Sequence, residues 1–289
     1  HASCVKPADY DGDGDIDLFI GASVMPFLYG MSPVSFLLQN NGKGIFNYDP
    51  SWLGQSTFDN PTQVRPGMVK DAAWIDLNKD TLPDLILVGE WMPVTVLIQQ
   101  PDHRFLNQTS AYKLNETNGW WNTCETGDFD GDGDLDLVLG NLGLNSRIKA
   151  TPEKPLSMYL GDFDSNGGSD HIMVYFNGDN SYPFASRDQL VKQIPSLKKK
   201  FVHYKDYRDV KLEHIITPVQ KGNSALMTVE QLQSVFLKNN AGSFEMIPLP
   251  LEAQYFPIYG IKATDINDDG KLDVLLTGNM SATQPDFGS

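Results

Sequence analysis

Oxygen-bearing side chains spaced two residues apart recur five times along this chain of 289 residues. Each copy is a nine-residue loop with Asp or Asn at positions 1, 3, 5 and 9. Calcium takes about six to eight oxygen ligands at roughly 2.3–2.6 Å. Side chains at alternate positions of a tight loop can converge on one ion, while position 7 offers its backbone carbonyl. The spacing therefore predicts up to five calcium ions as the cofactors of this chain.

The predicted ligands are positions 1, 3, 5, 7 and 9 of the five loops. In chain order they are Asp9, Asp11, Asp13, Asp15 and Asp17; Asp76, Asn78, Asp80, Leu82 and Asp84; Asp128, Asp130, Asp132, Asp134 and Asp136; Asp162, Asp164, Asn166, Gly168 and Asp170; and Asp265, Asn267, Asp269, Lys271 and Asp273. Four loops have glycine at position 6, where a positive φ is needed for the sharp turn. The second loop has Thr81 there, and a β-branched residue resists that conformation, so residues 76–84 are the weakest candidate.

The net charge of −15 agrees with this interpretation, because the five loops hold more than half of the 37 acidic residues. Carboxylates packed so closely repel one another unless a cation lies among them. The same charge argues against nucleic acid as a partner, since its phosphates would be repelled. The sequence has no apolar stretch long enough to span a membrane.

The residues that follow the loops exclude an EF-hand, which needs a glutamate at position 12 and a helix on each side. Position 12 is apolar in every loop: Ile20, Leu87, Leu139, Met173 and Leu276. Short apolar runs bounded by turn residues, such as residues 18–21 and 137–140, predict strands buried on both faces. Residues 35–46 and 234–244 predict hairpins. A strand on each side of the loop and one hairpin make a four-stranded antiparallel unit, which repeats as the blade of an all-β propeller.

Two motifs resemble FG-GAP/VCBS repeats. These are the loop Asp-x-Asp-x-Asp-Gly-x-x-Asp followed by Asp-Leu-x-x-Gly, and the hairpin Leu-x-Asn-Asn-Gly-x-Gly-x-Phe. Such repeats occur in integrin α-chain propellers and in cartilage-acidic-protein-like bacterial families, and residues 89–93, 118–122 and 140–146 resemble the large VCBS-repeat proteins of Bacteroidetes. The resemblance covers essentially the whole chain, 1–289, as one propeller segment. It implies a seven-bladed ring, structural calcium, and an extracellular or outer-membrane-associated location.

The loop spacing departs from that pattern in two places. Asp128 and Asp162 are 34 residues apart, too few for a full blade, so the third blade is expected to lack or shorten its outer strands. The 103 residues from Asp162 to Asp265 predict an insertion. Because the chain starts close to the first loop and stops soon after the fifth, we expect an arc of the ring, within a longer chain or a surface complex.

A helical insertion is predicted at residues 186–214. Ser186 and Gln189 form a capping box at its start, and Pro195 divides it into two short helices. Lysines 198–200 and their neighbours make it basic within an acidic protein. A solvated face lying against the propeller is favoured, and a docking element for an acidic partner or for another part of the chain is the alternative.

Catalytic signatures are missing from the sequence. It contains no Gly-x-Ser-x-Gly elbow, His-Glu-x-x-His or phosphate loop, and the five histidines are scattered. Pairs of loop aspartates could be glycosidase acids, but they recur five times with one spacing, which favours chelation. The two cysteines, Cys4 and Cys124, are interpreted as small buried side chains rather than a disulfide.

The function expected is a calcium-stabilised, non-catalytic scaffold that binds a protein or a glycan at the cell surface. Four tryptophans, at positions 74, 91, 120 and 121, could stack on sugars, although packing between blades is the favoured role. The alternative is the propeller domain of a calcium-dependent lyase or glycosidase that degrades polysaccharides. That alternative rests on analogy of fold alone.

Overall fold

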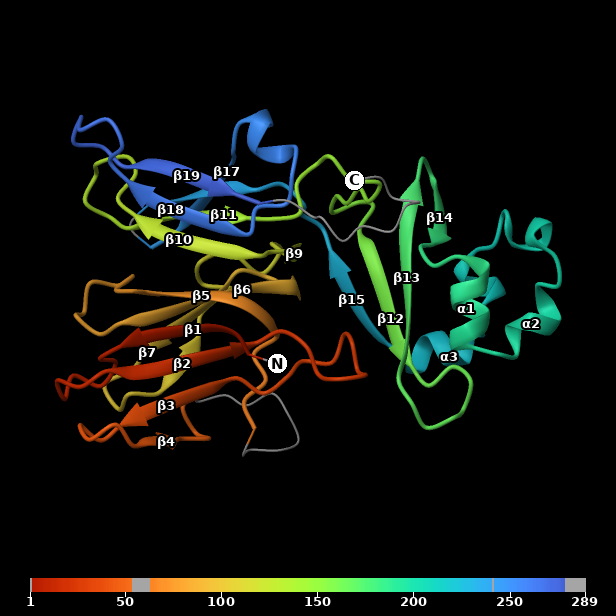
Figure 1. The fold of residues 1–289 in the computed structure, drawn as a ribbon, viewed down its shortest axis with the longest axis horizontal. Helices are drawn as coiled ribbons and strands as arrows, with labels where there is room; N and C mark the ends of the chain where they lie inside the picture. Colours follow the sequence, from red (N-terminus) through yellow and green to blue (C-terminus); the bar gives the residue numbers. More distant parts are fainter. Residues whose placement is uncertain (1, 54–62, 241, 279–289) are drawn as a thin grey trace.

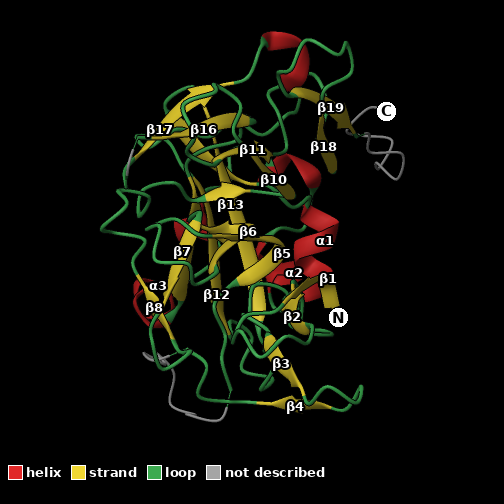
Figure 2. Cartoon of the chain, turned by 90° about the vertical axis from the view of Figure 1, so that its left-hand side faces the viewer, coloured by secondary structure: helices red, strands yellow, loops and turns green. Residues whose placement is uncertain are grey.

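The computed structural model describes residues 2–53, 63–240 and 242–278 of the chain, and within them the strands form five antiparallel sheets (Figure 1). Four sheets lie side by side on the left of Figure 1, and one lies with the helices on the right. Strands and loops dominate the second view as well (Figure 2). The described part of the chain is therefore mostly β, and it contains the expected four-stranded antiparallel sheets.

The first two sheets are meanders in which an Asp-rich loop joins the first strand to the second. The first contains β1 (Ala2–Ala8), β2 (Asp17–Ala22), β3 (Phe36–Asn40) and β4 (Phe46–Tyr48). The second contains β5 (Met68–Ile75), β6 (Asp84–Met92), β7 (Thr95–Gln99) and β8 (Phe105–Asn107), and β9 (Gly119–Trp120) also pairs with β6.

The third sheet is completed by strands from beyond a long insertion. It contains β10 (Thr123–Gly127), β11 (Asp136–Gly140), β16 (Val235–Asn239) and β17 (Phe244–Pro248). Leu137 of β11 pairs with Leu237 of β16. The prediction that the third blade lacks or shortens its outer strands is therefore wrong. The number of residues between two loops does not measure the size of a blade when the outer hairpin of that blade follows a long insertion in the sequence.

The insertion between β11 and β16 forms a separate sheet, which contains the fourth Asp-rich loop. That sheet has the order β14-β13-β12-β15, with β12 (Leu156–Gly161), β13 (Asp170–Asn177), β14 (Asn180–Pro183) and β15 (Ala225–Val229). Between β14 and β15 lie α1 (Arg187–Gln193), α2 (Leu197–Lys200), the 3-10 turns η1 (Tyr204–Tyr207) and η2 (Leu212–His214), and α3 (Pro218–Asn223). Helical structure thus continues past the expected limit at residue 214. The capping box of Ser186 and Gln189 is present, and Pro195 lies between α1 and α2.

After β17, the turn η3 (Leu251–Gln254) leads to the fifth sheet, β18 (Gly260–Thr264) paired with β19 (Asp273–Thr277). Strand β5 contacts both β1 and β10, and β10 also contacts β18, so the strand that precedes each of these four loops faces the equivalent strand of the next sheet. No helix in the described part of the chain has the length and apolar character needed to cross a bilayer.

Hydrophobic clusters fill the spaces between the sheets. Phe19 and Leu85 belong to a cluster between the first and second sheets, and Ile86 and Leu137 to one between the second and third. Met68 and Leu156 belong to a third cluster, which holds the inserted sheet against the second. Trp121 is fully buried, and Trp74, Trp91 and Trp120 pack in or against these clusters, which is the packing role favoured from the sequence.

The two cysteines carry free thiols, and Cys124 is buried while Cys4 is half-buried. Burial raises the pKa of the Cys4 thiol to about 11 and that of Cys124 well above its ordinary value. Both thiols are therefore protonated and unreactive at neutral pH, as expected of small buried side chains.

Asp71 of β5 links the first three sheets. Its carboxylate lies 2.7 Å from the Lys6 ammonium on β1 and accepts hydrogen bonds from Thr123 Oγ1 at 2.9 Å and from the Cys124 backbone N–H at 3.1 Å on β10. Only 13% of the Asp71 side chain is exposed, so solvent replaces these contacts poorly.

Replacement of Asp71 by alanine is expected to lower the free energy of unfolding by about 2 kcal/mol, because it leaves polar groups of two neighbouring strands without an acceptor. Chemical denaturation measures the loss. Asp179→Ala is the matched control, since Asp179 pairs with Lys154 and its side chain is 94% exposed. Equal losses for the two variants would show that Asp71 is not a special link between sheets.

Candidate metal centres

All five Asp-rich loops fold into the same turn, which the aspartate at position 1 organises. In the first loop Asp9 accepts hydrogen bonds from the backbone N–H groups of Gly12 at 2.9 Å and Gly14 at 3.1 Å, one on each carboxylate oxygen. Asp128 makes the same pair of bonds in the third loop, whereas Asp76, Asp162 and Asp265 accept from the N–H groups of positions 5 and 6, again one on each carboxylate oxygen. The side chain at position 3 accepts from the N–H of position 5, as Asp130 does from Asp132 at 3.1 Å. Local hydrogen bonds therefore fix the side chains that the repeat places at odd positions.

Two positions of each turn adopt the left-handed backbone conformation. At position 6, φ lies between 75° and 92° in Gly14, Thr81, Gly133, Gly167 and Gly270. Thr81 is thus held in this conformation, and its N–H donates to Asp76 at 3.0 Å, so its branched side chain does not prevent the turn. Position 4 also has φ between 59° and 78°, in Gly12, Lys79, Gly131, Ser165 and Asp268. The sequence analysis missed position 4, although its glycines in two loops were a visible signal.

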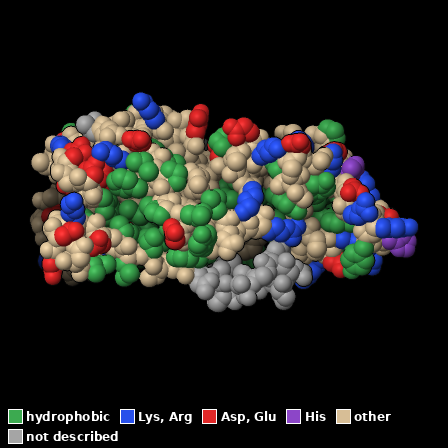
Figure 3. Space-filling view, turned by 90° about the horizontal axis from the view of Figure 1, so that it is seen from above, with side chains coloured by type: hydrophobic (Ala, Val, Ile, Leu, Met, Phe, Trp, Pro, Cys, Tyr) green, Lys and Arg blue, Asp and Glu red, His purple; other side chains and the backbone are tan. Residues whose placement is uncertain are grey.

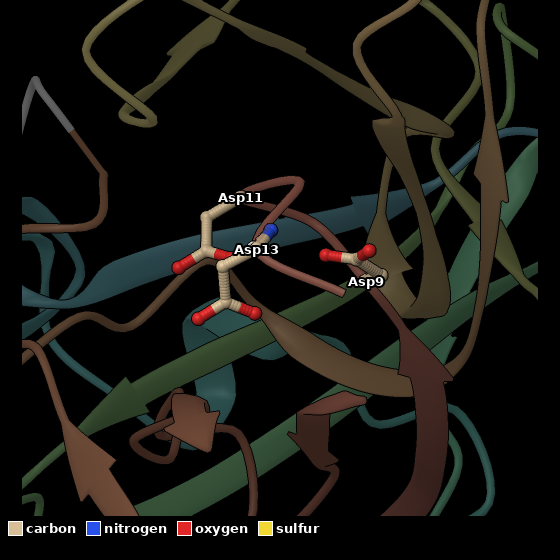
Figure 4. A group of neighbouring side chains, drawn as sticks. All are labelled: Asp9, Asp11 and Asp13. Carbon is tan, nitrogen blue, oxygen red and sulfur yellow. Dashed lines mark hydrogen bonds between the residues drawn. The ribbon is translucent and has the colours of Figure 1, made fainter. Parts of the chain in front are cut away.

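Three of the loops bring three carboxylates together, with one oxygen of each within 4.8 Å of the others. The groups are Asp9, Asp11 and Asp13; Asp128, Asp130 and Asp136; and Asp162, Asp164 and Asp170. Figure 4 shows the Asp9 carboxylate opposite those of Asp11 and Asp13 across the turn of one loop. Such groups of hard oxygen ligands suit a divalent cation of the calcium type.

The first loop fits such a cation in a further respect. Asp15 Oδ1, at position 7, is buried and has no hydrogen-bond partner within residues 2–53, 63–240 and 242–278. Burial, with the charges of Asp13 and Asp11 next in importance, raises the pKa of Asp15. A cation held by Asp9, Asp11 and Asp13 would offset this repulsion, and it would supply a positive charge near an oxygen that otherwise lacks a partner.

The second and fifth loops have an asparagine at position 3, where the other three loops have an aspartate. Asn78 and Asn267 stand at position 3, and their side-chain amides donate to the carboxylates of Asp80 at 2.8 Å and Asp269 at 3.2 Å. Position 7 is Leu82 or Lys271, which leaves the backbone carbonyl as the oxygen there. The turn is thus retained in these loops while the negative charge is reduced.

In the first, second and third loops the aspartate at position 9 is buried and links its loop to the third strand of the sheet. In the third loop Asp136 accepts hydrogen bonds from the N–H of Phe129 at 3.2 Å and from the N–H of Asn239 on β16 at 2.8 Å. Asp17 and Asp84 bond in the same way to the third strands of their sheets. Burial raises the pKa of Asp84 to about 6, against the opposing effect of its N–H donors. Burial therefore favours a carboxylate neutralised by a proton or a cation.

The third strand of a sheet also contributes a side chain to the loop, which sequence reasoning missed. Gln39 donates to Asp11 at 2.5 Å in the first sheet, and Lys238 forms an ion pair with Asp130 in the third. Both residues precede the asparagine of the hairpin motif, so the signal was their place in that motif. The hydrogen bond to Asp130 raises the pKa of Lys238 and lowers that of Asp130.

Replacement of Lys238 by glutamine is expected to increase the calcium affinity of the third loop several-fold, because the lysine ammonium competes with calcium for Asp130. Calorimetric titration with calcium, at low ionic strength, measures the change. Lys262→Gln is the control, since it removes an equal charge that pairs with Glu125 on a strand at 2.8 Å. An unchanged titration for Lys238→Gln would contradict the competition.

Comparison with known families places one repeat within this site. Residues 76–139 match an FG-GAP-like repeat. That stretch begins with the second loop, includes the third, and ends in β11. Among solved structures, the chain has a probability of 0.98 of similarity to a lectin of Agrocybe aegerita described as recognising non-reducing terminal N-acetylglucosamine, at 12% identity and a TM-score of 0.29, over 95% of this chain and 71% of that one. No curated protein matches the chain.

Proposed function

We propose that this chain, an FG-GAP repeat protein through residues 76–139, is a calcium-stabilised, non-catalytic scaffold that binds a protein or a glycan. The observation that carries the proposal is the shared turn of the five loops, three of which group carboxylates within 4.8 Å. The same geometry in loop after loop suits a structural ion, whereas an active site is a single constellation.

The arrangement of the sheets supports an arc of a β-propeller as the architecture of the scaffold. Strands β1, β5, β10 and β18 contact one another in order, and each precedes an Asp-rich loop. In a propeller the innermost strands of successive blades are neighbours in this way. The inserted sheet and its helices would then form an appendage on the third blade.

The proposed location is extracellular or associated with an outer membrane. Extracellular calcium modules typically bind with dissociation constants of about 10⁻⁴–10⁻³ M. Millimolar calcium outside cells would fill such sites, and cytosolic calcium would not. A signal-bearing fusion retained in the cytoplasm of the native host would contradict this part of the proposal.

Binding without turnover is the test of the proposed function. The calcium-loaded chain is applied to immobilised polysaccharides and to surface extracts of its host, and soluble polysaccharides are assayed for new reducing or unsaturated ends. Calcium-dependent retention with intact polysaccharide is expected. Cleavage that continues through repeated purification would overturn the non-catalytic proposal in favour of a lyase or a glycosidase.

A further inference from the structure

A basic and aromatic groove lies between the inserted sheet and its helices. Its larger hollow, of about 540 Å³, is bounded by the end of β13, β14, the start of α1 and the turn η1. A second hollow of about 400 Å³ shares Arg147 and Tyr175 with the first, so the two are adjacent. Tyr175 lies near the end of β13, whereas the fourth Asp-rich loop leads into its start. The groove is therefore separate from the metal loops.

The charge of the groove is opposite to that of the protein. Among the residues that the structure describes, five cations and no carboxylate line its two hollows: Arg147, Lys149, Lys154, Lys205 and Arg208. Asp179 and Asp209, which pair with Lys154 and Arg208, lie outside the lining. Figure 3 shows Lys and Arg side chains, together with Asp, Glu and His, among hydrophobic ones over this helical end of the molecule. In a chain of net charge −15, such a lining suits an anionic ligand.

Aromatic rings line the same groove in fixed orientations. Arg147 lies over the rings of Tyr175 at 5.2 Å and Phe184 at 5.4 Å, and it donates a hydrogen bond to the Tyr175 hydroxyl at 3.0 Å. The rings of Tyr175 and Phe184 meet edge to face at 6.0 Å. The Tyr207 hydroxyl donates to the Ala185 carbonyl at 2.8 Å. The polar and aromatic groups of the groove are thus preorganised.

Tyr204 is the most exposed of these rings and is nevertheless held in place. Its side chain is 70% exposed, its hydroxyl donates to Asp188 at 2.6 Å, and the Arg187 guanidinium lies 5.2 Å from its ring centre. Ordering an exposed aromatic side chain costs conformational entropy, and a ring ordered in advance binds a ligand at a lower cost. The ring is therefore suited to be a platform for a ligand.

We propose that this groove binds an oligosaccharide bearing carboxylate or sulfate groups. The C–H faces of sugar rings pack on aromatic faces, sugar hydroxyls bond to tyrosine and amide groups, and arginine pairs with the anion. The proposal deepens the function proposed above, on which it rests, by naming a glycan class. A peptide rich in acidic residues would use the cations but would offer no ring faces to the tyrosines, and a nucleic acid would be repelled by the rest of the surface.

Titration of the full chain in excess calcium tests the groove. The probes are tetragalacturonate and a heparin-derived tetrasaccharide, with methyl-esterified tetragalacturonate as the uncharged counterpart and hexaglutamate as the peptide. At least one acidic tetrasaccharide is expected to bind at least about tenfold more tightly than the esterified form and the peptide. Its affinity should fall as salt is added.

Variants assign the binding to the groove. Arg147→Gln and Tyr204→Ala are each expected to weaken binding at least about fivefold without lowering the melting temperature by more than about 3 °C. Arg104→Gln, an equal charge change on the loop between β7 and β8, is the matched control and should bind as the parent does. Absence of binding by both acidic probes, equal binding of hexaglutamate, or binding unaffected by Arg147→Gln and Tyr204→Ala would overturn the proposal. These results test the groove alone. The proposed role of calcium in the fold is tested separately, by thermal unfolding in calcium and in EGTA.

Discussion

Removal of calcium is expected to lower the melting temperature of this chain by roughly 15–30 °C. A ligand that binds only the native state adds RT ln(1 + [L]/Kd), or about 2.7 kcal/mol per site at a hundredfold excess over Kd. The three loops that group carboxylates would reach that excess in about 10 mM calcium if Kd is about 10⁻⁴ M. For a domain of this size, about 1 kcal/mol corresponds to roughly 2–4 °C. Thermal unfolding in calcium and in excess EGTA measures the shift.

Two controls separate chelation from simple screening of the aspartates. Sodium chloride at equal ionic strength should recover only a small part of the stability, because it screens repulsion without occupying the loops. Magnesium should recover part of it, since Mg²⁺ favours octahedral geometry and keeps most of its water ligands. Identical melting temperatures in calcium and EGTA would refute structural calcium in these loops.

The calcium-dependent stabilisation that a loop provides is expected to depend on the carboxylates it contains. Asn substitution at position 3 of the first loop, Asp11→Asn, makes that loop resemble the second, where Asn78 already stands at that position. Part of the calcium-dependent stabilisation should then be lost while the turn is retained. The turn should be retained because both Asp11 and Asn78 accept a hydrogen bond from the N–H of position 5 through a side-chain oxygen, which asparagine also has.

The turns were predictable because their determinants are local. Positions 1 to 9 contact one another, and side chains at alternate positions converge whatever the rest of the chain does. Thr81 shows the limit of judging one residue by its type alone. A β-branched residue disfavours a positive φ, but the hydrogen bond from the Thr81 N–H to Asp76 holds it in that conformation. The hydrogen bonds within the loop override a weak preference of this kind.

The path of the chain after β11 was not predictable from loop spacing. The 34 residues between Asp128 and Asp162 suggested a truncated blade, yet β16 pairs with β11 from beyond the inserted sheet. Two hydrophobic hairpins of similar sequence, at residues 35–46 and 234–244, were recognised, but the sheet to which the second belongs depends on contacts far apart in sequence. The groove formed by Arg147, Tyr175 and Tyr204 has the same origin, because it arises where the insertion folds back on its own sheet.

The hydrogen bond from Asn239 to Asp136, which joins β16 to the start of β11, is expected to contribute more to stability than the exposed hydrogen bonds of the same loop. Asp136 is fully buried, and its two oxygens accept the N–H groups of Phe129 and Asn239, the latter 103 residues away. In Asp136→Asn one oxygen becomes an amide group that faces a backbone donor, and a buried N–H loses its acceptor. We expect the free energy of unfolding in EGTA to fall by about 3 kcal/mol.

Hydrogen exchange shows which strands of Asp136→Asn lose stability. In Asp136→Asn the amides of β16 and β17 should exchange faster than those of β10, because the outer hairpin is held to β11 after a long insertion and loses one of its attachments. Asp17→Asn, with the same burial and an equivalent bond to Asn40, should loosen β3 and β4 instead. Asp102→Asn on an exposed turn should change neither stability nor exchange. If β16 and β17 stay protected in Asp136→Asn, the return of the chain to this sheet depends on the apolar contacts of Val235 and Leu237 rather than on the buried carboxylate.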